Sequence, residues 1–282
     1  MSEPLLTIGI TTYNRRVLLE TVAQSLAQVN RVNEARVWVL DDCSQEYDTD
    51  FVRRLFPQAM VHRAAQNSGG ADYAMHRLFE HFVRNGRGYL LNLDADLLAS
   101  RHLVDKCLQI IESHDGAPPA CLYSLFNTVS HPALGTDGEF LIKRSVGAAG
   151  TLWPHALLAD VVQHVPATRK YDWDWSAYLS GRGVPIRVTR RSYVQHLGRI
   201  GQNSRCFAGM DHGEQFDDYR NDNLASFLDH TREGLLKMLA EQQARIDNQA
   251  KAIEQISRVV QSQAQVINAL IGTVSANESL TS

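Results

Sequence analysis

Short apolar runs alternate with amphipathic stretches along the first hundred residues. Mainly apolar runs fall at 5–12, 37–40 and 89–93, and a further short strand is predicted at 60–63. Between them lie stretches with apolar residues at helical spacing, at 17–28, 51–55 and 71–85. Strands that alternate with helices in this way form right-handed βαβ units, in which helices cover both faces of the sheet. The pattern therefore predicts an α/β fold with a mainly parallel central sheet.

The pattern becomes less regular in the second part of the chain. Helices are expected at 101–113, 154–164 and 174–179, a strand at 122–126 and a glycine-rich turn at 147–150. In open α/β sheets, ligands bind at the carboxyl ends of the strands. Polar residues gather there after the first, second and fourth predicted strands, so we expect one crevice along that edge.

A heptad pattern occupies the end of the chain. Its a positions are Leu239, Ile246, Ile253, Val260, Ile267 and Val274, and its d positions are Leu235, Gln242, Gln249, Ile256, Gln263 and Leu270. A sustained repeat of this period favours a left-handed coiled coil, whereas a single helix folded back on its domain needs a broader apolar face. Three glutamines at d leave dimer and trimer open.

These patterns divide the chain into four segments. We predict an α/β domain over 1–222, a helical connector over 223–234, a coiled-coil oligomerisation helix over 235–275 and a disordered tail over 276–282.

Composition narrows the class of partner. The formal net charge is −3 and 44% of the residues are hydrophobic, so the chain can bury a sizeable core but lacks the basic excess of a nucleic-acid-binding protein. No run approaches the roughly 18 apolar residues of a membrane span. We expect a cytoplasmic protein, with peripheral placement at the inner membrane as the alternative. The four single cysteines are expected to be reduced structural thiols: Cys43, Cys107, Cys121 and Cys206.

Two carboxylates one residue apart follow the strand at 89–93. Asp94 and Asp96, in the sequence LNLDAD, can reach the same hard cation, such as Mg²⁺ or Mn²⁺. Such a cation would stabilise charge on a diphosphate. The alternative is a helix N-cap before the helix at 101–113.

Two further motifs carry polar groups to the same edge. In VLDDCS, the carboxylate of Asp42 could accept the imide N–H of uracil or thymine, or it could form an Asx turn. In the loop at 67–71, glycines before a helix could approach ribose or phosphate, although a plain loop explains them equally well.

The order of these motifs is more specific than any one of them. The series TTYNR, DDCS, NSGGADYAMHR and DADLL resembles the nucleotide-binding half of family 2 glycosyltransferases, which have the Rossmann-like GT-A fold. The resemblance covers about residues 5–215. It implies that Asp94 and Asp96 form the DXD metal motif, with Asp96 the firmer ligand and Mn²⁺ favoured over Mg²⁺. It implies nucleotide contacts from Thr11, Tyr13, Arg15, Asp42, Asn67, Arg77 and Asp94.

The resemblance extends into the segment YDWDWS. Asp172 falls where the family carries its general base, with Asp174 as the fallback because Tyr171 replaces the usual glutamate. A sugar hydroxyl must lose its proton as it attacks, and a nearby carboxylate can accept that proton. A single base opposite the leaving diphosphate implies inversion at the anomeric carbon. The alternative is an N-cap for the helix that follows.

Other residues complete the implied site. His196, in YVQHLG, would be a further metal ligand or else a structural histidine, and Arg199 and Arg205 would neutralise phosphate charge from a loop. Small residues at 147–150, with Gly150 among the sugar-site residues, would leave room for the donor sugar, or they would serve equally in a tight turn. Trp153 and Trp173 could stack on sugar rings on the acceptor side, or pack in the core.

The sequence thus predicts a metal-dependent inverting glycosyltransferase. Its donor would be a UDP-sugar or dTDP-sugar, and its acceptor a hydroxyl of a glycan or glycolipid, in bacterial surface polysaccharide or O-antigen synthesis. The alternative is a catalytically weak nucleotide-sugar-binding scaffold organised by the coiled coil.

Overall fold

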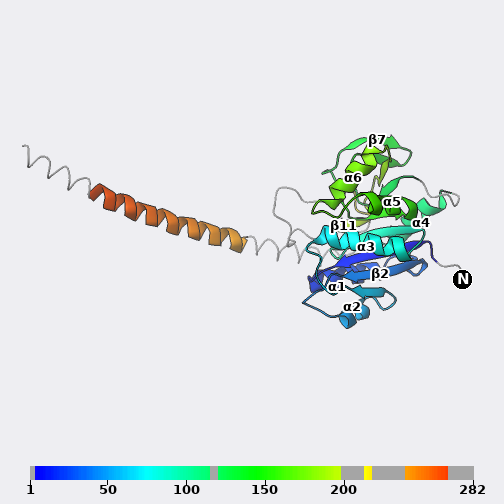
Figure 1. The fold of residues 1–282 in the computed structure, drawn as a ribbon, viewed down its shortest axis with the longest axis horizontal. Helices are drawn as coiled ribbons and strands as arrows, with labels where there is room; N and C mark the ends of the chain where they lie inside the picture. Colours follow the sequence, from blue (N-terminus) through cyan, green and yellow to red (C-terminus); the bar gives the residue numbers. More distant parts are fainter. Residues whose placement is uncertain (1–3, 115–119, 198–212, 218–238, 266–282) are drawn as a thin grey trace, which may run out of the picture. The chain divides into compact units, whose positions relative to one another are not determined.

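A computed structural model describes residues 4–114, 120–197, 213–217 and 239–265 (Figure 1). The chain divides into two compact units, Met1–Leu228 and Asp229–Ser282. In the part of the chain that the structure describes, no helix is both long and apolar enough to cross a membrane.

The first half of the first unit follows the predicted alternation of strands and helices. Its elements are β1 (Leu6–Thr12), α1 (Arg16–Leu26), the 3₁₀ turn η1 (Val32–Glu34), β2 (Ala35–Asp41), α2 (Thr49–Leu55), β3 (Met60–Arg63), α3 (Ala71–Asn85) and β4 (Tyr89–Asp94). The four strands lie in the order β3-β2-β1-β4, and every neighbouring pair is parallel. This half is the parallel sheet that the sequence predicts.

The second half adds short strands in mixed directions. Its elements are β5 (Leu97–Ala99), α4 (Leu103–Glu112), β6 (Leu122–Ser124), β7 (Ala133–Asp137), β8 (Phe140–Lys143), β9 (Thr151–Pro154), α5 (His155–His164), α6 (Tyr171–Gly181), β10 (Ile186–Thr189) and β11 (Val194–His196). Five strands extend the sheet to the order β3-β2-β1-β4-β9-β6-β10-β8-β7. β9 runs antiparallel to both of its neighbours, and β8 is antiparallel to β10 and β7.

The prediction of a mainly parallel sheet is therefore correct only for the first half. Among these later strands, only the run at 122–126 was predicted. The others have three to five residues, too few to show a clear period.

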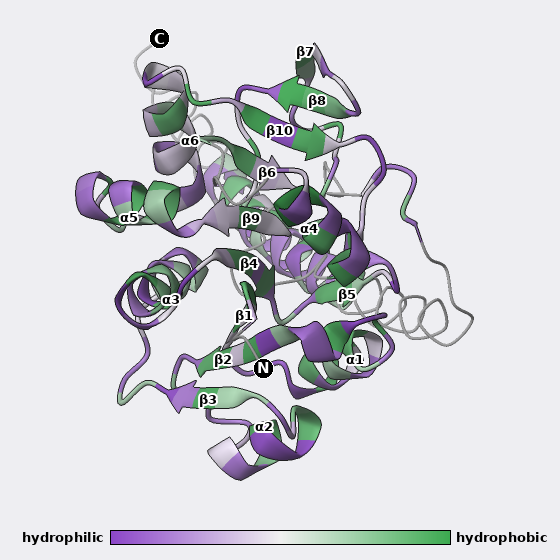
Figure 2. Ribbon diagram, turned by 90° about the vertical axis from the view of Figure 1, so that its right-hand side faces the viewer, coloured by the Kyte–Doolittle hydropathy of each residue, from purple (hydrophilic) through white to green (hydrophobic). Residues whose placement is uncertain are grey.

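Helices cover both faces of the sheet, as Figure 2 shows. One hydrophobic core joins α1, α2 and α4 to side chains such as Leu91 and Leu93 of β4. The other joins α3, α5 and α6 to side chains such as Leu90 of the same strand. Successive residues of a strand point to opposite faces, so a strand buried on both sides is mainly apolar. This explains the leucines and the tyrosine at 89–93, and the buried exception, Asn92, donates a hydrogen bond to Ala148 O.

The second unit contains a helix over residues 239–265, drawn in orange in Figure 1. All of these residues are exposed in the single chain. The exposed large apolar side chains include the a residues of the heptad pattern and one d residue: Leu239, Ile246, Ile253, Val260 and Ile256. The helix lies inside the segment 235–275 that the heptad pattern marks.

Candidate active site

The site is built at the carboxyl ends of β1, β2 and β4. Register places Thr11 of β1 beside Leu40 of β2 on one side and Asp94 of β4 on the other. The chain then turns through two consecutive left-handed residues, Asn14 (φ 53°) and Arg15 (φ 60°), before α1 begins. Left-handed backbone is uncommon outside glycine and concentrates at functional sites. This turn, which the sequence pattern did not reveal, places Arg15 against Asp96.

The two acids of the DXD motif make different contacts. Thr11 Oγ1 donates to Asp94 Oδ1 at 2.9 Å. Arg15 Nη1 donates to Asp96 Oδ2 at 2.8 Å, and His196 Nε2 lies 3.5 Å from the same oxygen. His196 is brought there by β11, which pairs antiparallel with β5 and sets His196 opposite Leu97. The structure thus joins residues that lie a hundred positions apart in the sequence.

The N-cap alternative for Asp94 and Asp96 does not hold. β5 intervenes between the motif and α4, and the N-cap residue of α4 is His102. The two carboxylates therefore face the sheet edge and not a helix start.

Burial and neighbouring charges shift the pKa values of the two carboxyl groups in opposite directions. Burial raises the pKa of Asp94 to about 6, and the neighbouring charge of Asp96 acts in the same direction. Burial also opposes ionisation of Asp96, but His196 and Arg15 outweigh it and hold the pKa of Asp96 well below its ordinary value. Asp96 is therefore the acid that stays ionised, as expected for the firmer metal ligand.

One oxygen of this cluster fits a cation. Asp96 Oδ1 is buried and has no hydrogen-bond partner among the described residues. A buried carboxylate oxygen without a donor is costly unless a cation or water meets it. No three His, Cys, Asp or Glu side chains of the described residues are already arranged to hold a metal ion.

The second motif divides its acids between two loops. Asp41 Oδ1 accepts from Ser44 N at 2.9 Å, a local turn contact three residues on, and Asp41 Oδ2 accepts from Arg63 Nη1 at 2.7 Å. Asp42 Oδ2 accepts from Asn67 Nδ2 at 2.8 Å and from Ser68 N at 2.9 Å.

A further contact completes this arrangement, since Arg77 Nη1 donates to Asp42 Oδ1 at 3.2 Å. Asp42, Asn67 and Arg77, all predicted to line the nucleotide, are thus one hydrogen-bonded group. Because Asp42 already serves these donors, its hydrogen bond to a base stays a prediction.

The predicted base lies at the start of α6. This helix begins at Tyr171, earlier than predicted, and its N-cap residue is Lys170. Asp172 and Asp174 are therefore in the first turn, and the N-cap alternative for Asp172 is wrong. Burial raises the pKa of Asp172 to about 6, and the charges of Asp72 and Asp94 raise it further. The side chain of Asp174 accepts a hydrogen bond from Thr168.

The aromatic residues separate into core and surface. Trp153 and Trp175 are fully buried and meet edge to face at 5.0 Å between ring centroids. Their packing matches the core alternative, so a sugar cannot reach Trp153 in this structure. Trp173 is 56% exposed and lies 5.5 Å from the ring of His131. It directly follows Asp172 in the sequence, and its stacking on an acceptor sugar stays a prediction.

Gly150 occupies a turn that requires glycine. Its φ is +62°, and a Cβ there would lie 2.8 Å from Val194 Cγ2. Its N–H donates to Asn92 O of β4 at 3.1 Å, and its carbonyl accepts from Leu125 N at 2.8 Å. Gly150 therefore links β4, β6 and β11 behind the site.

We predict that Gly150→Ala lowers the free energy of unfolding by about 1–3 kcal/mol, because the substitution combines backbone strain with a close contact. Urea denaturation followed by circular dichroism measures this change. Gly147→Ala is the matched control, since a Cβ at Gly147 meets nothing within 4 Å. Equal stability of the two variants would contradict the prediction.

For some predicted residues the structure gives only a position in the fold, and others lie outside the described residues. Tyr13 is half-buried on the turn after β1. Arg199 and Arg205 lie outside the described residues, as do the segments 223–234 and 276–282. Cys43, Cys107 and Cys121 are free thiols, in line with the expectation, and Cys206 is outside the described residues.

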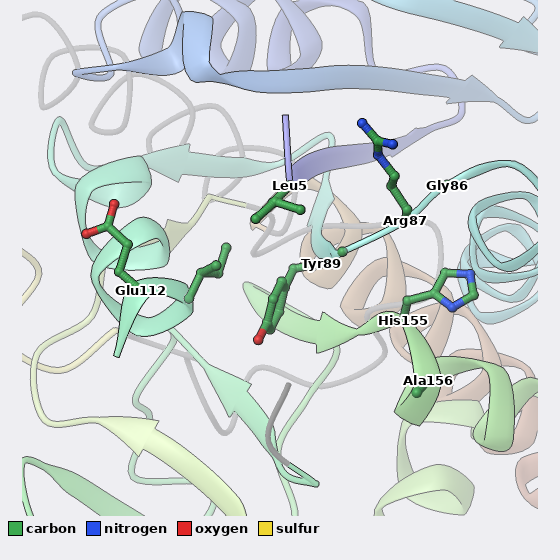
Figure 3. A pocket seen from close by; sticks show the side chains of 9 residues that line it. Leu5, Gly86, Arg87, Tyr89, Glu112, His155 and Ala156 are labelled. Atoms are coloured by element: carbon green, nitrogen blue, oxygen red, sulfur yellow. The ribbon is translucent and has the colours of Figure 1, made fainter. Parts of the chain in front are cut away.

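A cavity of about 470 Å³ lies at the opposite edge of the sheet (Figure 3). It is at the amino ends of β1 and β4, and its lining residues are Leu5, Gly86, Arg87, Gly88, Tyr89, Ile111, Glu112, His155 and Ala156. None of the predicted site residues lines it. The cavity is therefore separate from the candidate active site.

Comparison with known proteins gives a family match for the first part of the chain. The model of Glycosyl transferase family 2 matches residues 7–128, which hold β1 to β6 and the DXD motif. No curated protein matches the chain.

Solved structures with a similar fold include TarS 1-349 of S. aureus, at 18% identity and a TM-score of 0.49, covering 67% of this chain and 59% of that one. The UDP-GlcNAc complex of TarS 1-349 has 20% identity and a TM-score of 0.48, covering 67% and 57%. The mannosyltransferase PcManGT from Pyrobaculum calidifontis, in complex with GDP-Man and Mn²⁺, has 16% identity and a TM-score of 0.48, covering 68% and 59%. The chain spans less than two thirds of each of these chains.

The match of the family model covers the strands and turns that carry Thr11, Arg15, Asp42, Asp94 and Asp96. Over residues 7–128, this chain is therefore similar to glycosyl transferase family 2.

Proposed function

We propose that the protein is an inverting glycosyltransferase that moves a sugar from a UDP-sugar or dTDP-sugar to a hydroxyl of a glycan or glycolipid. The observation that carries this proposal is the meeting of Arg15, Asp96 and His196 at the sheet edge, inside and beside the matched family segment. A cytoplasmic role in the synthesis of bacterial surface polysaccharide or O-antigen fits such an activity.

Asp96 is the residue best suited to hold a divalent cation, with Asp94 and His196 beside it. The buried oxygen Oδ1 of Asp96 and the low pKa of this acid support that assignment. A mixed oxygen and imidazole set suits Mn²⁺ better than Mg²⁺. When bound, the cation would stabilise negative charge on the diphosphate of the donor.

Asp172 is the proposed general base. The charge of Asp94 contributes to the raised pKa of Asp172, which supports a place for this carboxyl group in the same site. A base works best when its pKa is near the working pH, and a pKa of about 6 meets this condition. Tyr171, which replaces the glutamate usual in the family, is fully buried and packs against Phe79. It anchors the helix, and its presence does not remove the base.

A panel of nucleotide-sugars, each with and without Mn²⁺, tests the proposal. We expect one donor to raise the melting temperature only in the presence of the metal, and the same donor to release its diphosphate slowly. A donor that stabilises the protein without any diphosphate release would favour the scaffold alternative. A protein that binds no donor with any metal would overturn both.

We also propose that the helix at 239–265 forms a parallel coiled coil with further copies of this chain. An isolated helix with an exposed apolar stripe is marginal in water, and a second copy would cover that stripe. Isoleucine at both a and d, as at Ile253 and Ile256, favours more than two strands. Grouped active sites would raise the effective concentration of the ends of a polymeric acceptor.

We predict that deleting residues 236–282 converts the protein into a monomer that still releases diphosphate from its donor. Sedimentation velocity measures the mass, and diphosphate release reports the first unit. Ile253→Asp should act in the same direction, whereas Lys251→Asp, on the opposite face of the heptad, should leave the oligomer intact. Oligomers that persist after the deletion would refute the coiled-coil assignment.

A further inference from the structure

A short segment late in the first unit is hydrogen bonded to the approach to β11, the strand that carries His196. This segment is residues 213–217. Its Glu214 O accepts from Ser192 N at 2.9 Å, and its Asp217 N donates to Ser192 O at 3.0 Å. Ser192 lies two positions before β11, so the backbone of the segment is attached to the chain just ahead of the strand.

Side chains attach the same segment to β11 and to its partner strand β5. Gly213 N donates to Gln195 Oε1, in β11, at 3.1 Å. Phe216 is buried in a small apolar cluster with Leu98 of β5 and Leu197, the residue that follows β11. The segment therefore contacts β11 before, within and after the strand, and it also packs on β5.

The carboxylate of Asp217 brings three polar side chains together around this segment. Its side chain is only 6% exposed. Arg191 Nη1 donates to Asp217 Oδ1 at 2.6 Å, and Ser100 Oγ donates to Oδ2 at 3.0 Å. His102 Nδ1 lies 2.6 Å from the same Oδ2. Burial opposes ionisation of Asp217, but the hydrogen bonds from these three partners outweigh it and hold its pKa below the ordinary value. Asp217 is thus an ionised, buried carboxylate that ties the segment to the chain on either side of the β5–β11 pair.

The β5–β11 pair is short, so its position depends on such neighbours. β11 has three residues and pairs only with β5 among the described strands. Ser100 N donates to Tyr193 O at 2.9 Å at one end of the pair, and Leu197 N donates to Asp96 O at 2.8 Å at the other. The last side chain of β11 is His196, whose Nε2 lies 3.5 Å from Asp96 Oδ2. Fixing the β5–β11 pair therefore fixes the imidazole beside the DXD motif.

We propose that Asp217 is a positioning residue for the metal ligand His196: it fixes the 213–217 segment against β5 and β11, and so keeps the imidazole beside Asp96. The inference rests on the metal site of the proposed function. Asp217 contacts neither the cation nor a substrate in this proposal, and its effect passes through the backbone of β11. Groups that orient a metal ligand from outside the coordination sphere contribute roughly 10- to 100-fold to metal affinity.

Titration of the full chain with Mn²⁺ alone tests this role without any turnover. The electron paramagnetic resonance signal of free Mn²⁺ gives the dissociation constant for wild type, Asp217→Ala and Asp217→Asn. Asp160→Ala is the matched control, because Asp160 has the same kinds of partner in another place. It accepts from Arg182 Nη1 at 2.8 Å and from Tyr178 Oη at 3.0 Å, and His164 Nδ1 lies 3.3 Å from it. These contacts join α5 to α6 and do not involve β11.

We expect Asp217→Ala to weaken Mn²⁺ binding by about 10-fold or more, and Asp217→Asn, which keeps the shape and one acceptor oxygen, by about 3- to 10-fold. Asp160→Ala should bind Mn²⁺ as the wild type does, although both alanine variants lower the melting temperature. If Asp217→Ala does not fold, Asp217→Asn still decides.

A second background, His196→Ala, separates positioning of the ligand from a general effect on the fold. With the imidazole gone, Asp217→Asn should change Mn²⁺ affinity by less than about 2-fold, because the group that it positions is absent. An equal loss in both backgrounds, or an unchanged affinity in Asp217→Asn while His196→Ala binds more weakly, would overturn the role of Asp217 alone. A wild type that binds no Mn²⁺, or a His196→Ala variant that binds it as tightly as the wild type, would overturn the metal assignment on which the inference rests.

Discussion

Asp96→Ala should abolish the stabilisation of the protein by donor and Mn²⁺ and reduce diphosphate release by about 100-fold or more. The reason is that Asp96 is the acid held ionised by Arg15 and His196, and its Oδ1 is the buried oxygen with no hydrogen-bond partner among the described residues. Removing it takes away the group best suited to hold the cation. Thermal shift and diphosphate release, each titrated with Mn²⁺, measure the effect.

The substitution also leaves Arg15 without its carboxylate, so folding must be checked separately. Asp96→Asn keeps the shape and one acceptor and should retain the fold while losing most of the metal dependence. Asp105→Asn, in the first turn of α4, is a control far from the DXD motif in its contacts, since it bonds Asn30. If Asp96→Asn keeps the wild-type response to Mn²⁺, Asp96 is not the principal metal ligand.

Asp172→Asn should reduce kcat by about 10²–10⁴-fold while donor binding changes little. An amide cannot accept the proton of the attacking hydroxyl, but it fills the same space at the start of α6. In the wild type, turnover should fall as the pH drops through about 6, because Asp172 must be ionised to act and its pKa is raised to that value. A pH-rate profile and donor titration of both proteins provide the measurement.

Asp174→Asn distinguishes the base from its fallback. Asp174 is hydrogen bonded to Thr168, so its loss should affect kcat less than the loss of Asp172. The reverse order of effects would transfer the base role to Asp174. A wild type with no acidic limb would contradict the assignment of either acid.

The first half of the fold could be predicted because its elements are long and regular. The boundaries of β3 and α3 match the prediction, and for α3 the reason is an amphipathic stretch of about four turns with a clear helical period. Because the strands could be predicted, the polar residues that follow them could be assigned to the carboxyl ends of the sheet. Once the strands are known, the sheet brings Thr11 and Asp94 together.

The rest depends on contacts that no local pattern records. The left-handed turn at Asn14 and Arg15 is held by hydrogen bonds to Ser44 and Asp96. The sequence did not indicate it, because neither residue is a glycine. Trp153 and Trp173 have the same chemistry in the sequence, yet only the tertiary fold makes one of them core and the other surface.

The position of β9 has a consequence for how the domain becomes stable. β9 comes after residue 128 in the chain but lies inside the sheet, between β4 and β6. A fragment that ended with the family segment would leave the edge of β4 unpaired, with the apolar run LLNL open to pairing with other chains. In such a fragment β4 would therefore be an edge strand, and β9 is the segment that covers this edge in the complete sheet.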